Sequence, residues 1–196
     1  MKVFWIRPDE DILPYIELIG GRKIKFKYGV EQKNFPDDQK AFFKSPKPLK
    51  KSLWHILTSL VVSEDLLPIY RKALLNFVQI LPINIENHGK AFLINVTTSG
   101  NDWFSIEESI FVDYSDHQKK EGKFIHQLDM RTSRLYPVDA VFIKDKIKAP
   151  IFNVIHNKDI LGPFCTLGLF PEEEELAALI LKNNIKGISL YENKLI

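Results

Sequence analysis

Residues 63–96 read SEDLLPIYRKALLNFVQILPINIENHGKAFLINV, and this stretch decides the class of fold. Its first half carries apolar residues at helical spacing, which predicts a helix over residues 64–76. Its second half holds two apolar runs on either side of Asn87-His88-Gly89, whose turn chemistry predicts an antiparallel hairpin. A helix followed directly by a hairpin favours an α+β protein over a doubly wound parallel sheet, in which helices and strands alternate.

The start of this helix depends on how the chain accommodates Pro68. Ser63 has the side chain of an N-cap, and Glu64 and Asp65 behind it suit the positive end of a helix. Proline inside a helix removes a backbone hydrogen bond, whereas proline in the first turn is tolerated. The sequence therefore leaves two starts open, one after Ser63 and one at Pro68.

A second helix is predicted over residues 172–182. Pro171 precedes four consecutive glutamates, residues 172–175, which compensate the positive end of the helix dipole. Apolar residues at helical spacing follow, and Asn183-Asn184 provides a stop signal. A short strand over residues 185–190 is expected directly after this helix.

Strand patterns account for most of the remaining chain. Apolar runs predict strands at residues 3–6, 23–28, 53–57, 124–130, 138–143 and 151–155. The last two of these are expected to pair with each other. We therefore predict an α+β fold of mostly antiparallel or mixed sheets with two main helices. Residues 1–52, with N-terminal strands and a basic Pro/Lys-rich connection, are expected to form one compact unit with an α+β domain over residues 53–196.

Composition excludes several classes of protein. The chain has 196 residues, 45% of them hydrophobic, with one cysteine and a formal net charge of +2. These values do not fit a disordered, collagenous or disulfide-rich chain. The apolar runs are shorter than the ~20 residues that span a bilayer, and the run before Arg7 is shorter than the roughly 7–15 residues of a signal peptide. A cytoplasmic protein without a membrane span is expected.

Residues 22–51 concentrate positive charge. They contain ten basic and three acidic residues, and basic side chains supply the sequence-independent part of nucleic-acid binding. However, three prolines interrupt the segment, and it lacks the aromatic spacing of a stacking platform. A solvated connection is favoured, and nucleic-acid binding is the alternative.

No pattern predicts a cofactor or a metal ion. The chain lacks a glycine-rich phosphate loop. Asp113, Asp116 and His117, with His126 beyond them, are the best set of metal ligands. Because these residues lie in a run of polar side chains, a surface loop explains them more simply.

A cysteine nucleophile is not favoured either. Cys165 has His156 as its nearest histidine in sequence, but it lies among apolar residues, where a thiol is inert. His55 and His156 both occur in predicted strands beside aromatic residues and are expected to be structural. No catalytic residue is therefore predicted.

Several short motifs resemble one bacterial family. They occur in the same order and at similar spacing, and they are Val62-Ser63-Glu64-Asp65-Leu66, Asn95, Asp102-Trp103-Phe104-Ser105, Ile151-Phe152 and Gly187-Ile188-Ser189-Leu190. The family, first described as a domain of unknown function, comprises immunity proteins encoded beside polymorphic toxins. The resemblance covers about residues 53–191.

The resemblance implies a non-catalytic cytoplasmic protein that binds a cognate toxin domain and blocks it. Charged residues beside aromatic anchors are typical of such interfaces. We therefore expect the partner-binding surface to include Asp102, Trp103, Phe104, Asp113 and Asp116. The alternatives are a hydrolase or transferase with a dispersed carboxylate and histidine site, and a nucleic-acid or regulatory binder that uses residues 22–51. The sequence leaves the oligomeric state open.

Overall fold

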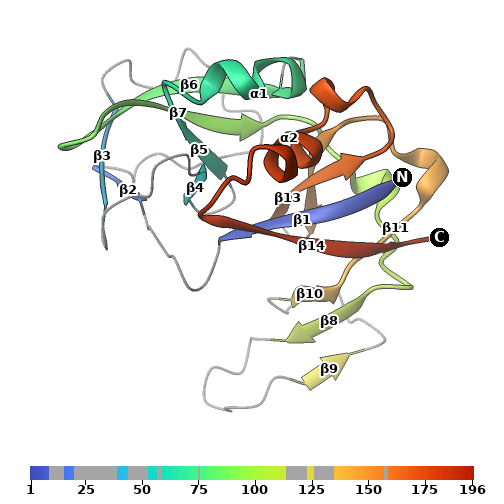
Figure 1. Ribbon diagram of the computed structural model, residues 1–196. Helices are drawn as coiled ribbons and strands as arrows, with labels where there is room; N and C mark the ends of the chain where they lie inside the picture. The colour runs from blue at the N-terminus through green and yellow to red at the C-terminus, as the bar shows by residue number, and fades with distance from the viewer. Residues whose placement is uncertain are drawn as a thin grey trace.

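The computed structural model describes residues 1–8, 16–19, 39–43, 53–56, 59–74, 76–113, 123–125, 135–156 and 159–196. Within these residues the chain forms three β-sheets and two α-helices, which confirms the predicted α+β class (Figure 1). The helices are α1 (Leu67–Leu74) and α2 (Leu176–Lys182). None of the described helices is long and apolar enough to cross a membrane.

A five-stranded sheet contains the strands from both ends of the chain (Figure 1). In order across the sheet its strands are β11 (Val141–Phe142), β14 (Ile188–Leu195), β1 (Lys2–Pro8), β13 (Asp159–Leu167) and β12 (Ile151–His156). All neighbours are antiparallel except β11 and β14, which are parallel. Strand β1 is central, since Phe4 lies opposite Glu192 on one side and Cys165 on the other.

A six-stranded sheet contains the predicted hairpin. Its strands, in order, are β2 (Ile16–Leu18), β3 (Lys40–Phe43), β6 (Val78–Ile85), β7 (Gly89–Val96), β5 (Ser59–Ser63) and β4 (Leu53–Ile56). The hairpin is formed by β6 and β7, which pair over their full lengths. In its turn Asn87 has a φ of 62° and Gly89 a φ of 86°. Asparagine and glycine tolerate this left-handed conformation better than other residues, so the turn forms where the sequence predicts it.

A small third sheet connects to the edge of the first. Its strands, in order, are β10 (Leu135–Asp139), β8 (Ile110–Asp113) and β9 (Lys123–Ile125). Only Ala140 separates β10 from β11, so the chain leaves one sheet and joins the other almost at once. In Figure 1 the small sheet projects below β14.

Alternation along β1 divides the core into two clusters, because successive side chains of a strand face opposite sides. Phe4 and Ile6 pack with the two helices and with β5 and β7 of the six-stranded sheet. Val3 and Trp5 contact a second cluster on the other face. Its buried aromatic members are Phe104, Phe111, Phe142, Phe152 and Phe164. Since burial of a large apolar side chain contributes about 1.5–3 kcal/mol, both faces of β1 help to hold the sheet in place.

Helix α1 begins at Leu67, next to the later of the two starts that the sequence leaves open, and α2 begins later than predicted. The chain forms a turn before α1, in which the Leu66 amide donates to the Ser63 carbonyl (3.2 Å), and Pro68 is the second helical residue. Proline is tolerated there because the first turn needs no intrahelical donor. Before α2, residues Glu172–Glu174 form a separate 3-10 turn, and the extended backbone of Glu175 (φ −111°, ψ 116°) interrupts the helix predicted from residue 172.

Two strand predictions near the C-terminus are wrong. Residues 138–143 do not pair with residues 151–155, because β12 pairs with β13, where Phe152 lies opposite Phe164. The sequence pattern does not predict β13, since Gly162-Pro163 in its middle is typical of a turn. The last strand begins at Ile188 and continues to Leu195, beyond the predicted end at residue 190. The predicted strand at residues 23–28 lies outside the described residues.

Candidate functional site

Two of the predicted partner-binding residues share one short turn. Asp102 and Trp103 belong to η3 (Asn101–Trp103), where Asp102 is exposed and Trp103 is half-buried. The Trp103 ring makes an edge-on contact with Phe152, with ring centroids 5.0 Å apart and an angle of 72° between the planes. Trp103 therefore anchors the turn to the core and keeps part of its ring accessible.

Phe104, which the sequence predicts as a partner contact, is a core residue. Its side chain is 7% exposed and packs against Phe111 and Phe142, with centroids 6.0 and 5.6 Å away. An aromatic residue in this environment contributes to stability. The aromatic pair Trp103-Phe104 thus presents one ring at the surface.

Most of the residues considered as metal ligands lie outside the described residues. Asp113 is the last residue of β8, whereas Asp116, His117 and His126 are not described. In the described parts of the chain, no group of three or more His, Cys, Asp or Glu side chains lies close enough together to hold a metal ion. The structure therefore places Asp102 and Asp113 in two different elements, and Asp116 lies outside the described residues.

Cys165 is buried, as predicted. Its side chain is 0% exposed and packs in the cluster that contains α2. Burial raises the pKa of the thiol, and the negative charge of Glu175 raises it further. A thiol that stays protonated is a poor nucleophile, so Cys165 is a core residue.

Glu175 is a buried carboxylate, which the sequence pattern does not reveal. It is 2% exposed, and its carboxylate oxygens accept hydrogen bonds from the backbone amides of Gly168 (2.6 Å), Leu169 (2.7 Å) and Phe170 (3.0 Å). Hydrogen bonds to an ionised acceptor are among the stronger ones in proteins. Glu175 therefore fixes the chain that leads from β13 to α2 and serves a structural purpose.

The neighbouring Glu172 has a different role at the surface. Its carboxylate accepts a hydrogen bond from the Lys182 ammonium at 2.8 Å, and this bond raises the pKa of Lys182. Both side chains are largely exposed. The four glutamates thus divide between three exposed residues, of which Glu172 pairs with Lys182 of α2, and one buried residue, Glu175.

A cleft of about 460 Å³ opens between β14 and the start of the small sheet. We call it the Arg7 groove. Its lining includes Trp5, Arg7 and Tyr191 from β1 and β14, which we call its base, and Glu108, Ile110 and Asp139, which we call its wall. The cleft adjoins Ala140, where the chain passes from β10 of the small sheet into β11, which pairs with β14.

The base of the Arg7 groove is a guanidinium held against two aromatic rings. Trp5 and Tyr191 lie directly opposite each other in β1 and β14, and Arg7 follows Trp5 on the same face of β1. The Arg7 Cζ atom is 3.8 Å from the centroid of the Trp5 ring and 4.9 Å from that of Tyr191. Such cation–π contacts contribute about 0.5–1 kcal/mol at exposed sites. They restrict the movement of the Arg7 guanidinium.

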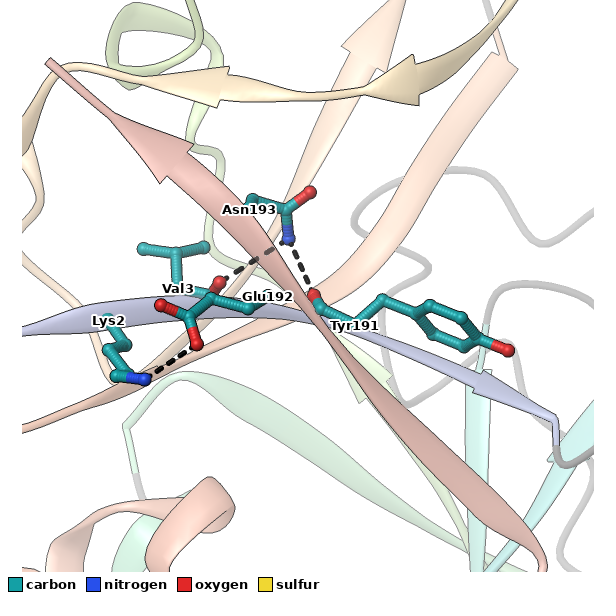
Figure 2. A network of polar contacts seen from close by, with 5 residues as sticks. All are labelled: Lys2, Val3, Tyr191, Glu192 and Asn193. Carbon is teal, nitrogen blue, oxygen red and sulfur yellow. Dashed lines mark hydrogen bonds and ion pairs between the residues drawn. The ribbon is translucent and has the colours of Figure 1, made fainter.

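Polar contacts on β14 fix the strand beside the groove (Figure 2). The Lys2 ammonium and the Glu192 carboxylate are 2.6 Å apart, and the Asn193 Nδ2 donates to the carbonyls of Val3 (3.4 Å) and Tyr191 (3.0 Å). Figure 2 shows the Tyr191 side chain pointing away from the Lys2–Glu192 pair. Tyr191 is 43% exposed and therefore remains accessible at the groove.

The composition of the groove is typical of a protein-binding surface. Trp, Tyr and Arg are the residue types most enriched among the dominant contacts of protein interfaces. Comparison of the chain with protein-family models and with curated protein sequences gives no match. Evidence about function therefore comes from the residues and their geometry.

Sequence reasoning missed this groove. The alternation of β1, with Phe4 and Ile6 on one face and Trp5 and Arg7 on the other, is visible in the sequence. It indicates a strand with two different faces, but nothing in the sequence indicates that Tyr191 lies opposite Trp5. The site depends on a pairing between the two ends of the chain.

Proposed function

We propose that this protein is a non-catalytic immunity protein that binds a cognate bacterial toxin domain in the cytoplasm and neutralises it. The short motifs that resemble the immunity family support this function. The Arg7 groove supports it independently, because it supplies a preformed surface of the kind that binds another protein.

The observation that carries the proposal is the position of Arg7 over Trp5 and Tyr191. A free arginine side chain loses rotational freedom when it binds, which costs roughly 0.5–1.5 kcal/mol for a flexible side chain. The two rings restrict Arg7 in advance and reduce this cost. They also offer their own exposed surface to a partner.

Charge on the wall of the groove indicates the chemistry of the partner. Glu108 and Asp139 are exposed, and neither makes an ion pair with another described residue. Carboxylates beside a binding surface favour a partner with basic residues and accelerate its association. The proposed toxin domain therefore presents a basic residue to Glu108 and Asp139, while Arg7 and Lys194 contribute positive charge elsewhere in the lining of the groove.

The surface predicted from sequence is retained as a second contact region. Asp102 and the accessible part of Trp103 would contribute from η3, and Asp113 and Asp116 from the end of β8 and the residues after it. Phe104 is left out because it is buried.

Growth of a bacterial host tests the proposal. The host expresses the protein encoded by the adjacent open reading frame, with or without this chain. We expect the adjacent protein alone to stop growth and the wild-type chain to restore it. Arg7→Ala is expected to restore growth poorly, whereas Arg71→Ala, which removes an exposed arginine on α1, is expected to behave like the wild type. An adjacent protein that is harmless, or toxicity that the wild-type chain does not relieve, would contradict the proposal.

A further inference from the structure

The two edges of the five-stranded sheet differ in how their backbone groups are used. At the β12 edge the Asn153 amide donates to the Thr98 carbonyl (2.9 Å), and the Gly100 amide donates to the Asn153 carbonyl (2.8 Å). The Asn101 side chain continues this pattern. Its Oδ1 accepts from the Ile155 amide (2.7 Å), and its Nδ2 donates to the Ile155 carbonyl (3.2 Å). The β12 edge is therefore closed by the chain itself.

The opposite edge, formed by β14, is paired only near its end. Strand β11 pairs with Lys194 and Leu195, and the Lys194 amide donates outward to the Ala140 carbonyl (3.3 Å). Backbone groups of alternate residues in a strand point to the same side, so those of Glu192 and Leu190 also point outward. Within the described ranges no strand pairs with them. We call these outward backbone groups the β14 edge.

The Arg7 groove lies beside the β14 edge. Its lining includes Tyr191, Glu192 and Lys194 from β14 and, across the cleft, Asp139 at the end of β10. Its volume of about 460 Å³ is within the ~300–1,000 Å³ typical of ligand-holding clefts. An unpaired strand edge and a cleft large enough for a short segment therefore coincide.

We infer that the Arg7 groove receives an extended segment of the partner, which adds a strand to the β14 edge and places a lysine or arginine beside Glu108 and Asp139. This inference deepens the proposed function and rests on it for the identity of the partner. In strand addition, main-chain hydrogen bonds provide affinity and alternate side chains provide specificity. Here the two wall carboxylates select a basic residue, and the Trp5 and Tyr191 rings contact the chain beside it.

Hydrogen exchange in the free protein gives the first test. The amides of Glu192 and Leu190 are expected to exchange rapidly, because they point away from β1. The amides of Tyr191 and Asn193 point toward β1 and are expected to be protected. Protection of Glu192 and Leu190 equal to that of their neighbours would show that the edge is already covered and would overturn the inference.

Synthetic peptides provide the second test. The probe is a capped peptide of alternating lysine and valine, and its controls are a glutamate–valine peptide and a lysine–valine peptide that is N-methylated along one edge. We expect the lysine peptide to shift the amide resonances of Glu192 and Leu190 in titrations at millimolar concentration. The glutamate peptide is expected to bind at least about tenfold more weakly, because like charges then meet at the wall. Equal binding of the N-methylated peptide, or no shift at these amides, would overturn the inference.

Two variants of Glu192 distinguish the contribution of its backbone amide to binding from that of its side chain. Glu192→Pro removes the outward amide, whereas Glu192→Ala removes only the carboxylate that contacts Lys2. Proline is tolerated in an edge strand whose amide faces outward. We expect Glu192→Pro to bind the lysine peptide and the adjacent-gene protein about tenfold more weakly than Glu192→Ala does, a loss typical of a hydrogen bond to the partner.

These experiments distinguish a failure of strand addition at the β14 edge from a failure of the proposed function. If the adjacent-gene protein binds both Glu192 variants equally, strand addition is wrong while the proposed function stands. If the lysine peptide binds at the β14 edge but the adjacent-gene protein does not bind, the proposed partner is wrong while the edge site stands. The N-methylated peptide tests the same hydrogen bonds in the unaltered protein, should Glu192→Pro fail to fold.

Discussion

Trp5 and Tyr191 lie directly opposite each other in neighbouring strands, although they come from opposite ends of the chain. The Arg7 guanidinium lies over both rings and forms the base of a cleft. The other face of β1 is buried in the core through Phe4 and Ile6. The surface residues are therefore held by the central strand of a sheet, which gives a binding site a more rigid support than a loop would give.

Glu175 is expected to matter for stability more than any other glutamate near it. Glu175→Ala leaves three backbone amides without their acceptor, so we expect the free energy of unfolding to fall. The expected loss is about 2–3 kcal/mol and no larger, because these amides regain some hydrogen bonding to water. Urea denaturation measures this change. The matched control is Glu173→Ala at an exposed position, which is expected to change stability by less than about 0.5 kcal/mol. Equal effects of the two substitutions would contradict the role of Glu175.

Cys165 is expected to make stability depend on alkaline pH. Burial raises the pKa of its thiol, so the folded protein keeps this proton above pH ~8.5, where an unfolded cysteine loses it. The unfolded state then binds fewer protons, and the free energy of unfolding falls as the pH rises from about 8.5 toward the higher folded pKa. Cys165→Ala is expected to flatten the decline between about pH 8.5 and 10 in urea titrations. An unchanged slope would contradict this account.

Gly100 is expected to be required for packing, although its backbone does not require glycine. Its φ of −104° and ψ of 21° are accessible to alanine, but a Cβ at this position would overlap the Phe152 ring. We expect Gly100→Ala to destabilise the protein by about 1–3 kcal/mol, as overpacking does. Thermal unfolding of Gly100→Ala and of the exposed control Ser99→Ala measures the difference. A Gly100→Ala variant as stable as the control would contradict this prediction, because it would show that the Phe152 ring moves aside at little cost in free energy.

The acidic residues predicted from sequence have a separate test. Asp113→Lys combined with Asp116→Lys reverses two charges, and we expect toxin binding to weaken by at least about tenfold if these residues meet a basic partner. Isothermal titration calorimetry measures the affinity. Unchanged binding would remove Asp113 and Asp116 from the interface, and the Arg7 groove with Asp102 and Trp103 would remain as the proposed contact surface.

Local patterns were sufficient to predict the elements whose structure is decided by neighbouring residues. The hairpin of β6 and β7 forms around Asn87 and Gly89 as expected, because the turn residues tolerate positive φ. The apolar setting of Cys165 likewise predicts its burial. In both cases the relevant physical interactions lie within a few residues along the chain.

Features that depend on contacts beyond a single helix or hairpin could not be predicted. Glu175 is typical of a helix start, yet its carboxylate binds the backbone of residues 168–170, which shifts the start of α2. Strand β13 contains Gly162-Pro163 and is stabilised by strands on both sides, β1 and β12. The Arg7 groove requires β1 to pair with β14. These contacts are set by the tertiary fold and leave no periodic signal in the sequence.

The most direct test of the proposed function is the affinity of the purified protein for the protein encoded by the adjacent open reading frame, measured by isothermal titration calorimetry. Loss of a dominant interface contact costs at least about 2 kcal/mol, so we predict that Arg7→Ala binds about 30-fold more weakly than the wild type. Arg71→Ala, on the exposed side of α1, and Tyr191→Phe, which keeps the aromatic ring, are predicted to bind like the wild type. Wild-type affinity of Arg7→Ala would contradict the account.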